Sequence, residues 1–161
     1  MNIRTDLRPE DRTLLEGLLR ATGFFNPREL RVALEVIDES LARGKKSEYR
    51  FLILEDEGKL IGYACWGPIT VTLTSADLYW MAVHPASQGK GLGRTLLETA
   101  EMWMAREGHT RVYLETSTRQ QYASTRTFYL RCGYEIVAEL PDFYEPGDGK
   151  AVFVKMLPRI H

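Results

Sequence analysis

The sequence predicts an α+β fold: a single mixed, largely antiparallel sheet flanked by about four helices. Three observations predict it. Two segments with apolar residues at helical spacing open the chain, alternating segments typical of antiparallel strands follow, and a strand–helix–strand order comes after them. With 161 residues, we expect one domain over residues 1–161.

Two helices are expected before the first long strand. Pro9 suits the first turn of one helix, and Gly23 is placed to end it. Asn26 is a good N-cap for the other, with Glu29 three residues on to complete a capping box, and Gly44 ends the run.

The period then changes to that of strands. We expect strands over residues 50–55, 59–67, 76–83, 111–115, 134–140 and 151–157, and helices over 92–106 and 124–131. Residues 141–149 are expected to form the loop of a closing hairpin.

Composition excludes several classes of protein. A formal net charge of −1 argues against a nucleic-acid binder, which needs a strongly basic face. No apolar run approaches the ~20 residues that span a bilayer, and the first residues lack the layout of a signal peptide. Two cysteines and three histidines without ligand spacing predict a reduced, cytoplasmic protein without a metal.

The strongest local signal is a glycine-rich segment between a strand and a helix. Its residues are Gln88, Gly89, Lys90, Gly91, Leu92, Gly93 and Arg94. Glycines allow a tight turn, and the backbone N–H groups at a helix start favour an anion such as a pyrophosphate. The string of a P-loop is absent, and the glycine spacing differs from the dinucleotide fingerprint. A glycine-rich turn without a ligand is the alternative.

Together with a second motif, this segment resembles the GNAT superfamily of acyl-CoA-dependent N-acetyltransferases, and in part the peptide N-terminal acetyltransferases. The second motif, about 40 residues on, is Phe128-Tyr129 followed by Gly133-Tyr134. The resemblance implies that residues 88–94 bind the pyrophosphate of acetyl-CoA. It also implies that the strand backbone at Met81, Ala82 and Val83 pairs with the pantetheine arm.

The sequence departs from the family pattern at the start of the second motif's helix. Tyr122 and Thr125 stand where the family has Asn and Ala. The asparagine commonly contacts the cofactor arm, and the hydroxyl of Tyr122 is the candidate to replace it.

The resemblance assigns roles to two further residues. Tyr129 would give a proton to the departing thiolate; with reference pKa values of ~10 and ~8.5, the free transfer is uphill by about 2 kcal/mol. Glu115 would act as a relay to the amine or as an anchor for its cation, since a carboxylate of pKa ~4.3 cannot itself deprotonate an ammonium. The oxyanion donor would be a strand N–H near Val83. The alternatives are a core aromatic for Tyr129 and an exposed strand-end carboxylate for Glu115.

The acceptor side is assigned to the expected hairpin loop. Asp142, Tyr144 and Glu145 combine acidic and aromatic groups that suit a cationic amine, although a solvated loop has a similar composition. Trp66, Tyr79, Trp80 and the first two helices are candidates to complete the pocket.

We therefore expect an N-acetyltransferase that moves an acetyl group from acetyl-CoA directly to a primary amine, either a small molecule or a peptide N-terminus. A catalytically weak acyl-CoA-binding or sensing module is the alternative, and a nucleotide-binding protein fits the glycine spacing poorly. We expect no nucleic-acid or membrane partner, and a homodimer is one assembly open to the chain.

Overall fold

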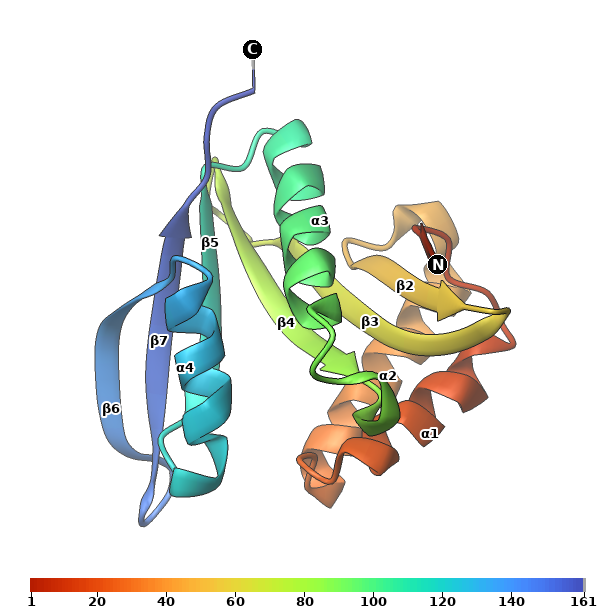
Figure 1. Cartoon of the computed structure of the whole chain (residues 1–161). Coiled ribbons are helices and arrows are strands. Elements are labelled where there is room, and N and C mark those ends of the chain that lie inside the picture. Colours follow the sequence, from red (N-terminus) through yellow and green to blue (C-terminus); the bar gives the residue numbers. More distant parts are fainter. Residues whose placement is uncertain (161) are drawn as a thin grey trace.

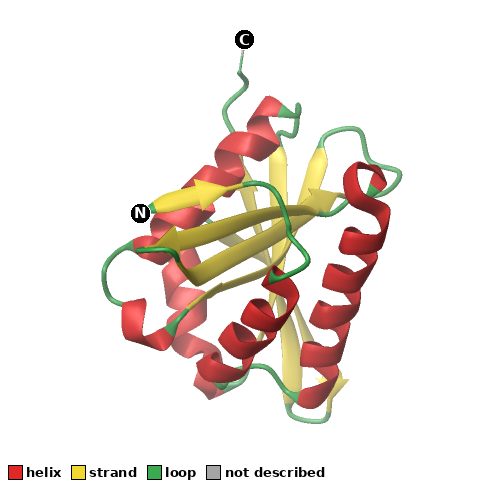
Figure 2. Ribbon diagram, turned by 90° about the vertical axis from the view of Figure 1, so that its right-hand side faces the viewer, coloured by secondary structure: helices red, strands yellow, loops and turns green. Residues whose placement is uncertain are grey.

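The computed structural model describes residues 1–160, which form one seven-stranded sheet with helices on both faces (Figures 1 and 2). The strands lie in the order β1-β2-β3-β4-β5-β7-β6. Their bounds are β1 (Asn2–Arg4), β2 (Arg50–Asp56), β3 (Lys59–Pro68), β4 (Ser75–Val83), β5 (Arg111–Ser117), β6 (Glu135–Glu145) and β7 (Asp148–Met156). All neighbours are antiparallel except β4 and β5, which confirms the predicted mixed sheet.

The helices are α1 (Asp11–Thr22), α2 (Pro27–Arg43), α3 (Leu92–Arg106) and α4 (Ala123–Arg131). The start of α2 is as predicted: the side chain of Asn26 accepts a bond from the Glu29 N–H at 2.8 Å, and Glu29 reaches back to the Asn26 N–H. Gly23 adopts the left-handed conformation that ends α1, because a residue without Cβ pays no penalty there.

Two apolar cores lie on opposite faces of the sheet. On one face, α3 and α4 pack on residues from both halves of the sheet, including Leu78, Leu114 and Phe153. On the other face, α1 and α2 pack only on residues of β2, β3 and β4. The β5–β7–β6 half of that second face contributes no residue to this core, and we call it the uncovered half.

The parallel pair at the centre of the sheet opens into a V. Residues 75–77 of β4 pair with residues 111–113 of β5, and the strands then diverge, as Figure 1 shows. A β-bulge in β4 contributes to this shape: Tyr79 is the extra residue, because Leu78 and Trp80 pair with the adjacent residues Trp66 and Cys65 of β3. A bulge bends its strand and redirects its side chains.

Two features differ from the expected elements. The short β1 was not predicted; it is held by Arg4, whose buried guanidinium binds both carboxylate oxygens of the fully buried Asp11. The expected loop over 141–149 is mostly strand, because β6 continues to Glu145 and only the turn before Asp148 is loop. Asp142 forms an irregularity within β6, with a positive φ of 57°.

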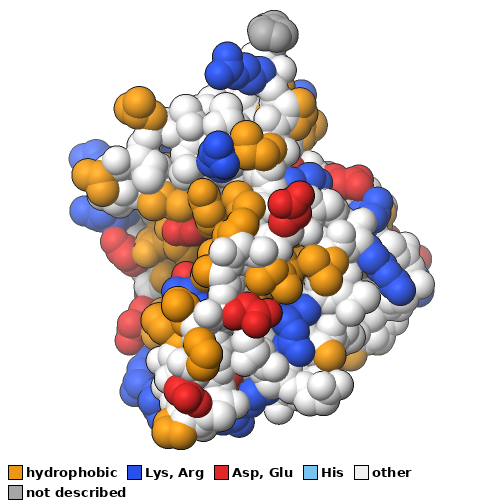
Figure 3. Space-filling model, turned by 90° about the vertical axis from the view of Figure 1, so that its left-hand side faces the viewer, with side chains coloured by type: hydrophobic (Ala, Val, Ile, Leu, Met, Phe, Trp, Pro, Cys, Tyr) orange, Lys and Arg blue, Asp and Glu red, His pale blue; other side chains and the backbone are white. Residues whose placement is uncertain are grey.

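The outer strand β6 is exposed along its whole length. Figure 3 views the molecule from this side and shows hydrophobic side chains gathered across the middle of the face, among charged ones. The exposed apolar residues of this strand are Ile136, Val137, Leu140, Phe143 and Tyr144. Among the described residues, no helix is both long and apolar enough to cross a bilayer.

Candidate functional site

The V between β4 and β5 leaves a row of backbone groups without a strand partner. Beyond Asp77, β4 keeps its pairing with β3 as far as Val83, while its opposite edge faces the gap. We call residues 78–83 on this side the open edge of β4. Strand edges present alternating N–H and C=O groups, so this edge can pair with an extended ligand that carries amides. Met81, Ala82 and Val83 lie on it.

The glycine-rich segment, residues 88–94, lies at the open end of the V, where α3 begins. Gly89 and Gly91 have positive φ values of 78° and 76°, and Gly91 is the N-cap. The first bond of the helix runs from the Thr95 N–H to Gly91 at 3.1 Å, so the N–H groups of residues 92–94 have no acceptor within the helix. These donors and the helix dipole suit a pyrophosphate.

Three side chains of the segment have different surroundings. The Gln88 side chain donates to the Val83 carbonyl at 3.0 Å and so ties the loop to the end of β4. The Arg94 guanidinium donates to the Arg131 carbonyl at 2.8 Å, which joins the start of α3 to the end of α4. Lys90 is exposed. The segment is thus held on both sides, and Lys90 is an exposed cation beside it.

Tyr129 belongs to α4 and lies in the apolar core between this helix and the sheet. Its ring packs against Phe128, Tyr134 and Phe153, with centroids 5.2, 5.7 and 6.0 Å away. Burial raises the pKa of its hydroxyl, so this group is a proton donor at neutral pH and not a phenolate. The packing holds the ring in one orientation, and Tyr134 is fixed in turn by donating to Glu101 at 2.8 Å.

Tyr122 contacts the turn between α1 and α2. Its hydroxyl donates to the Phe24 carbonyl at 2.8 Å, and the two rings lie 5.7 Å apart. The contact joins the start of α4 to the turn between α1 and α2. The hydroxyl expected to reach the cofactor arm is therefore engaged elsewhere.

Glu115 points from β5 toward the uncovered half of the α1–α2 face. Its carboxylate pairs with Lys150 of β7 at 2.8 Å, and the Lys150 ammonium lies 4.3 Å from the centre of the Phe143 ring. Tyr144 is close as well: burial and the nearby Glu115 carboxylate raise the pKa of its phenol to about 12. Sequence reasoning named Glu115 and Tyr144, and the structure brings them together.

Asp142 and Glu145, in contrast, are engaged by neighbours in the hairpin. Asp142 accepts a bond from the Gly147 N–H at 2.7 Å and so shapes the β6–β7 turn. Glu145 pairs with Arg119, which also pairs with Asp148 at 3.4 Å. Both acids therefore have structural partners beside the site.

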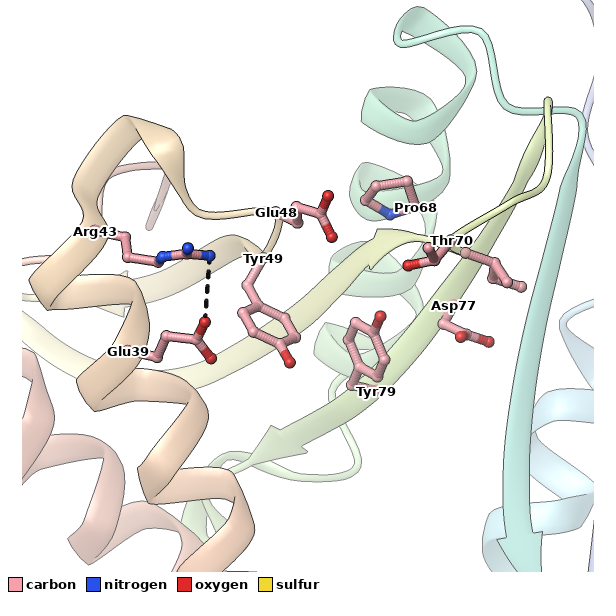
Figure 4. Close-up of a pocket in the computed structure, with 9 residues that line it drawn as sticks. Glu39, Arg43, Glu48, Tyr49, Pro68, Thr70, Asp77 and Tyr79 are labelled. Atoms are coloured by element: carbon pink, nitrogen blue, oxygen red, sulfur yellow. Dashed lines mark ion pairs between the residues drawn. The ribbon is translucent and has the colours of Figure 1, made fainter.

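An acidic pocket lies at the vertex of the V, and sequence reasoning missed most of it. This cavity of about 360 Å³ lies between α2 and the β3–β4 connection (Figure 4). It is lined by Glu39, Arg43, Glu48, Tyr49, Pro68, Ile69, Thr70, Asp77 and Tyr79. Tyr79 was among the sequence candidates, and so was the second helix, which contributes Glu39 and Arg43. Trp66, another candidate, is fully buried in the core on the opposite face and was wrongly considered for the pocket.

Asp77 connects the acidic pocket to the V. It is the last residue of β4 that pairs with β5, opposite Tyr113, and it is half-buried. Burial first, and the Glu115 carboxylate second, raise its pKa to about 6, while Lys150 lowers it. A carboxylate with this pKa exchanges protons readily near neutral pH, which general base catalysis requires.

Two tyrosines form the aromatic wall of the acidic pocket. Tyr49 and Tyr79 meet edge to face, with ring centroids 5.4 Å apart. Burial and the surrounding carboxylates raise the pKa of both phenols, that of Tyr79 to about 12. The tyrosines are therefore neutral, and the negative potential of the pocket comes from its carboxylates.

Comparison with known proteins gives consistent matches. A family model described as "Acetyltransferase (GNAT) family" matches residues 15–134. An uncharacterized N-acetyltransferase of Methanocaldococcus jannaschii is 28% identical over 112 residues, which cover 67% of each chain.

Solved structures agree with these sequence matches. A putative GNAT-family acetyltransferase from Desulfovibrio desulfuricans is 38% identical, with a TM-score of 0.95 over 98% of this chain and 99% of that one. An aminoglycoside 6'-N-acetyltransferase was solved in complex with coenzyme A, and its alignment with this chain covers 100% of both. The TM-score is 0.79 at 21% identity, which shows a shared fold.

Proposed function

This chain belongs to the acetyltransferase (GNAT) family, and we propose that the amine it acetylates reaches the V from the acidic pocket. It is an N-acetyltransferase that takes its acetyl group from acetyl-CoA. The observation that carries the proposal is Asp77, which lies both at the vertex of the V and in the wall of the acidic pocket.

The glycine-rich segment and the open edge of β4 suit acetyl-CoA. The N–H donors of residues 89–94 would hold the pyrophosphate, with Lys90 as an added cation. The open edge, including Met81, Ala82 and Val83, would pair with the amides of the arm. An arm that starts at residues 89–94 and follows this edge ends beside Asp77, at the vertex. The thioester is then delivered to the wall of the acidic pocket.

The two acids beside the vertex would prepare the amine. An amine arrives from water as a cation and must lose its proton before it attacks, so carboxylates serve first to bind it. Asp77 has the better matched pKa and no ion pair among residues 1–160, whereas Glu115 is held by Lys150. Asp77 would therefore receive the proton, directly or through water, and Glu115 would keep Lys150 in place or relay the proton outward.

Tyr129 would stabilise the thiolate that leaves. Its hydroxyl is neutral and its ring is fixed by three aromatic neighbours. A preorganised donor of this kind acts mainly in the transition state, where charge develops on sulfur.

The test is thiol release from acetyl-CoA with a panel of primary amines. We expect release with at least one cationic amine, and a loss of that activity in Asp77→Asn at unchanged affinity for CoA. If CoA raises the melting temperature but no amine releases thiol, the protein is an acyl-CoA-binding module. If Asp77→Asn is fully active, the amine enters elsewhere.

A further inference from the structure

The acidic pocket extends well beyond the vertex, and its far part contains charge that the acetyl transfer does not use. Glu48 lies just before β2, and Glu39 and Arg43 lie one turn apart on α2. Figure 4 shows Glu39 and Arg43 on one side of the Tyr49–Tyr79 pair and Asp77 on the other, with Glu48 above the two rings. A ligand that reaches from Asp77 to Glu48 therefore passes beside the aromatic wall.

Some of the charged side chains in and beside the pocket form ion pairs with each other. Glu39 and Arg43 form an ion pair at 3.5 Å and cancel each other. Glu115 and Lys150, beside the vertex, cancel in the same way at 2.8 Å. Two carboxylates remain without an ion pair among the described residues: Asp77 at the vertex and Glu48 above the tyrosine rings. The pocket therefore carries two uncompensated negative charges at two separate points of its wall.

From this arrangement, which rests on the function proposed above, we infer that the acceptor is a dication: an alkyl diamine or polyamine. One ammonium lies at Asp77 and is acetylated, and the second lies at Glu48. The methylene chain between them packs against Tyr49 and Tyr79, whose ring faces favour an apolar segment that carries cations at its ends.

The same charges exclude other amines. A free amino acid or an acidic peptide would bring a carboxylate toward Glu48. Arg43 does not offset this repulsion, since it is already paired. A monoamine would fill the vertex and leave Glu48 without a partner.

The experiment measures acetylation by the full chain with acetyl-CoA as donor. The acceptors are three four-carbon amines and one peptide. The probes are 1,4-diaminobutane, butylamine, 4-aminobutanoate and a neutral tripeptide, and the readout is kcat/KM from thiol release. We expect the diamine to exceed butylamine by about fivefold, the upper value for one well-placed exposed ion pair. We expect 4-aminobutanoate to be the poorest of the four, and the preference for the diamine to shrink as salt is added.

A pair of variants locates the second cation. Glu48→Gln should bring the diamine down to the level of butylamine while lowering kcat/KM for butylamine much less. Glu35→Gln is the matched control, because Glu35 is exposed on α2 and lines a different groove. It should keep the full preference for the diamine.

The outcomes separate this inference from the proposed function. If no amine is acetylated, the proposed function fails. If amines are acetylated but butylamine or the tripeptide equals the diamine, or if Glu48→Gln keeps the preference, then the dication inference is wrong and the enzyme remains an N-acetyltransferase.

Discussion

Replacing Asp77 by asparagine should make the protein more stable and less active. Asp77 is half-buried, and burial together with the Glu115 carboxylate raises its pKa from 3.8 to about 6. The folded state therefore opposes ionisation of this group. Asparagine has nearly the same shape and carries no charge, so it removes that cost.

The magnitude follows from the two pKa values. A difference of about two pKa units corresponds to roughly 3 kcal/mol for the ionised form, at about 1.4 kcal/mol per unit. Because Asp77 is only half-buried, solvent screens part of this, and we expect about 1–2 kcal/mol. For a chain of this size, that is a rise of about 3–6 °C in Tm.

The size of the stabilisation by Asp77→Asn depends on pH. Below about pH 4 the carboxyl is protonated in both folded and unfolded states, and the folded state incurs no cost. As the pH rises from about 4 to 6, the unfolded state releases its proton first, so the wild type loses stability. Above about pH 6 the loss is complete, and the advantage of Asp77→Asn is largest.

The assay is thermal unfolding at pH 4 and pH 8, with Asp56→Asn as the control. Asp56 is exposed at the end of β2. We expect Asp77→Asn to gain several degrees over wild type at pH 8 and almost nothing at pH 4, and the control to gain little at either. A variant that melts at or below the wild-type temperature at pH 8, or with the same gain at both, would refute this reasoning.

Three further substitutions test the other parts of the site. Gly91→Val places a β-branched residue at φ 76°, where only backbone strain opposes it since no atom lies within 4 Å; CoA should then no longer raise Tm, and an undiminished rise would show that the segment is not the pyrophosphate site. Tyr129→Phe should lower kcat and kcat/KM more than tenfold together, with little change in CoA affinity; an unchanged kcat at saturation would leave Tyr129 a packing residue. Glu115→Gln frees Lys150 to repel the amine, so KM for the amine should rise; it also removes the carboxylate that raises the pKa of Asp77, so the rising limb of the pH–rate profile should move to lower pH, and a wild-type KM and profile would remove Glu115 from the site.

The conformation of the glycine-rich segment could be predicted from sequence because it resides in the backbone of one short stretch. Gly89 and Gly91 have the positive φ values that glycine permits, and α3 starts at the predicted Leu92. The capping box at Asn26 was predictable for the same reason, because both of its partners lie within one turn.

The acidic pocket could not be predicted in this way. Its acids come from α2, from the residues before β2 and from β4, and each alone has the pattern of an ordinary surface acid. The sequence instead directed attention to the acids of the hairpin, which are adjacent in the chain. In the fold, Glu145 is paired with Arg119 and Asp142 shapes the turn.

The sequence by itself determined the family, the order of helices and strands, and the turn of the glycine-rich segment, since all of these depend on local periodicity and on glycine at particular positions. Only the tertiary structure brings together the residues to which we assign the amine. Pairing over three residues, followed by a bulge at Tyr79, opens β4 from β5 and places Asp77 at the vertex. The packing of α2 on β2–β4 then brings Glu48 and Glu39 within reach of the same cavity. These acids are far apart along the chain, and they line one cavity only because the sheet and α2 hold them there. A local sequence pattern carries no information on which distant residues come close in space.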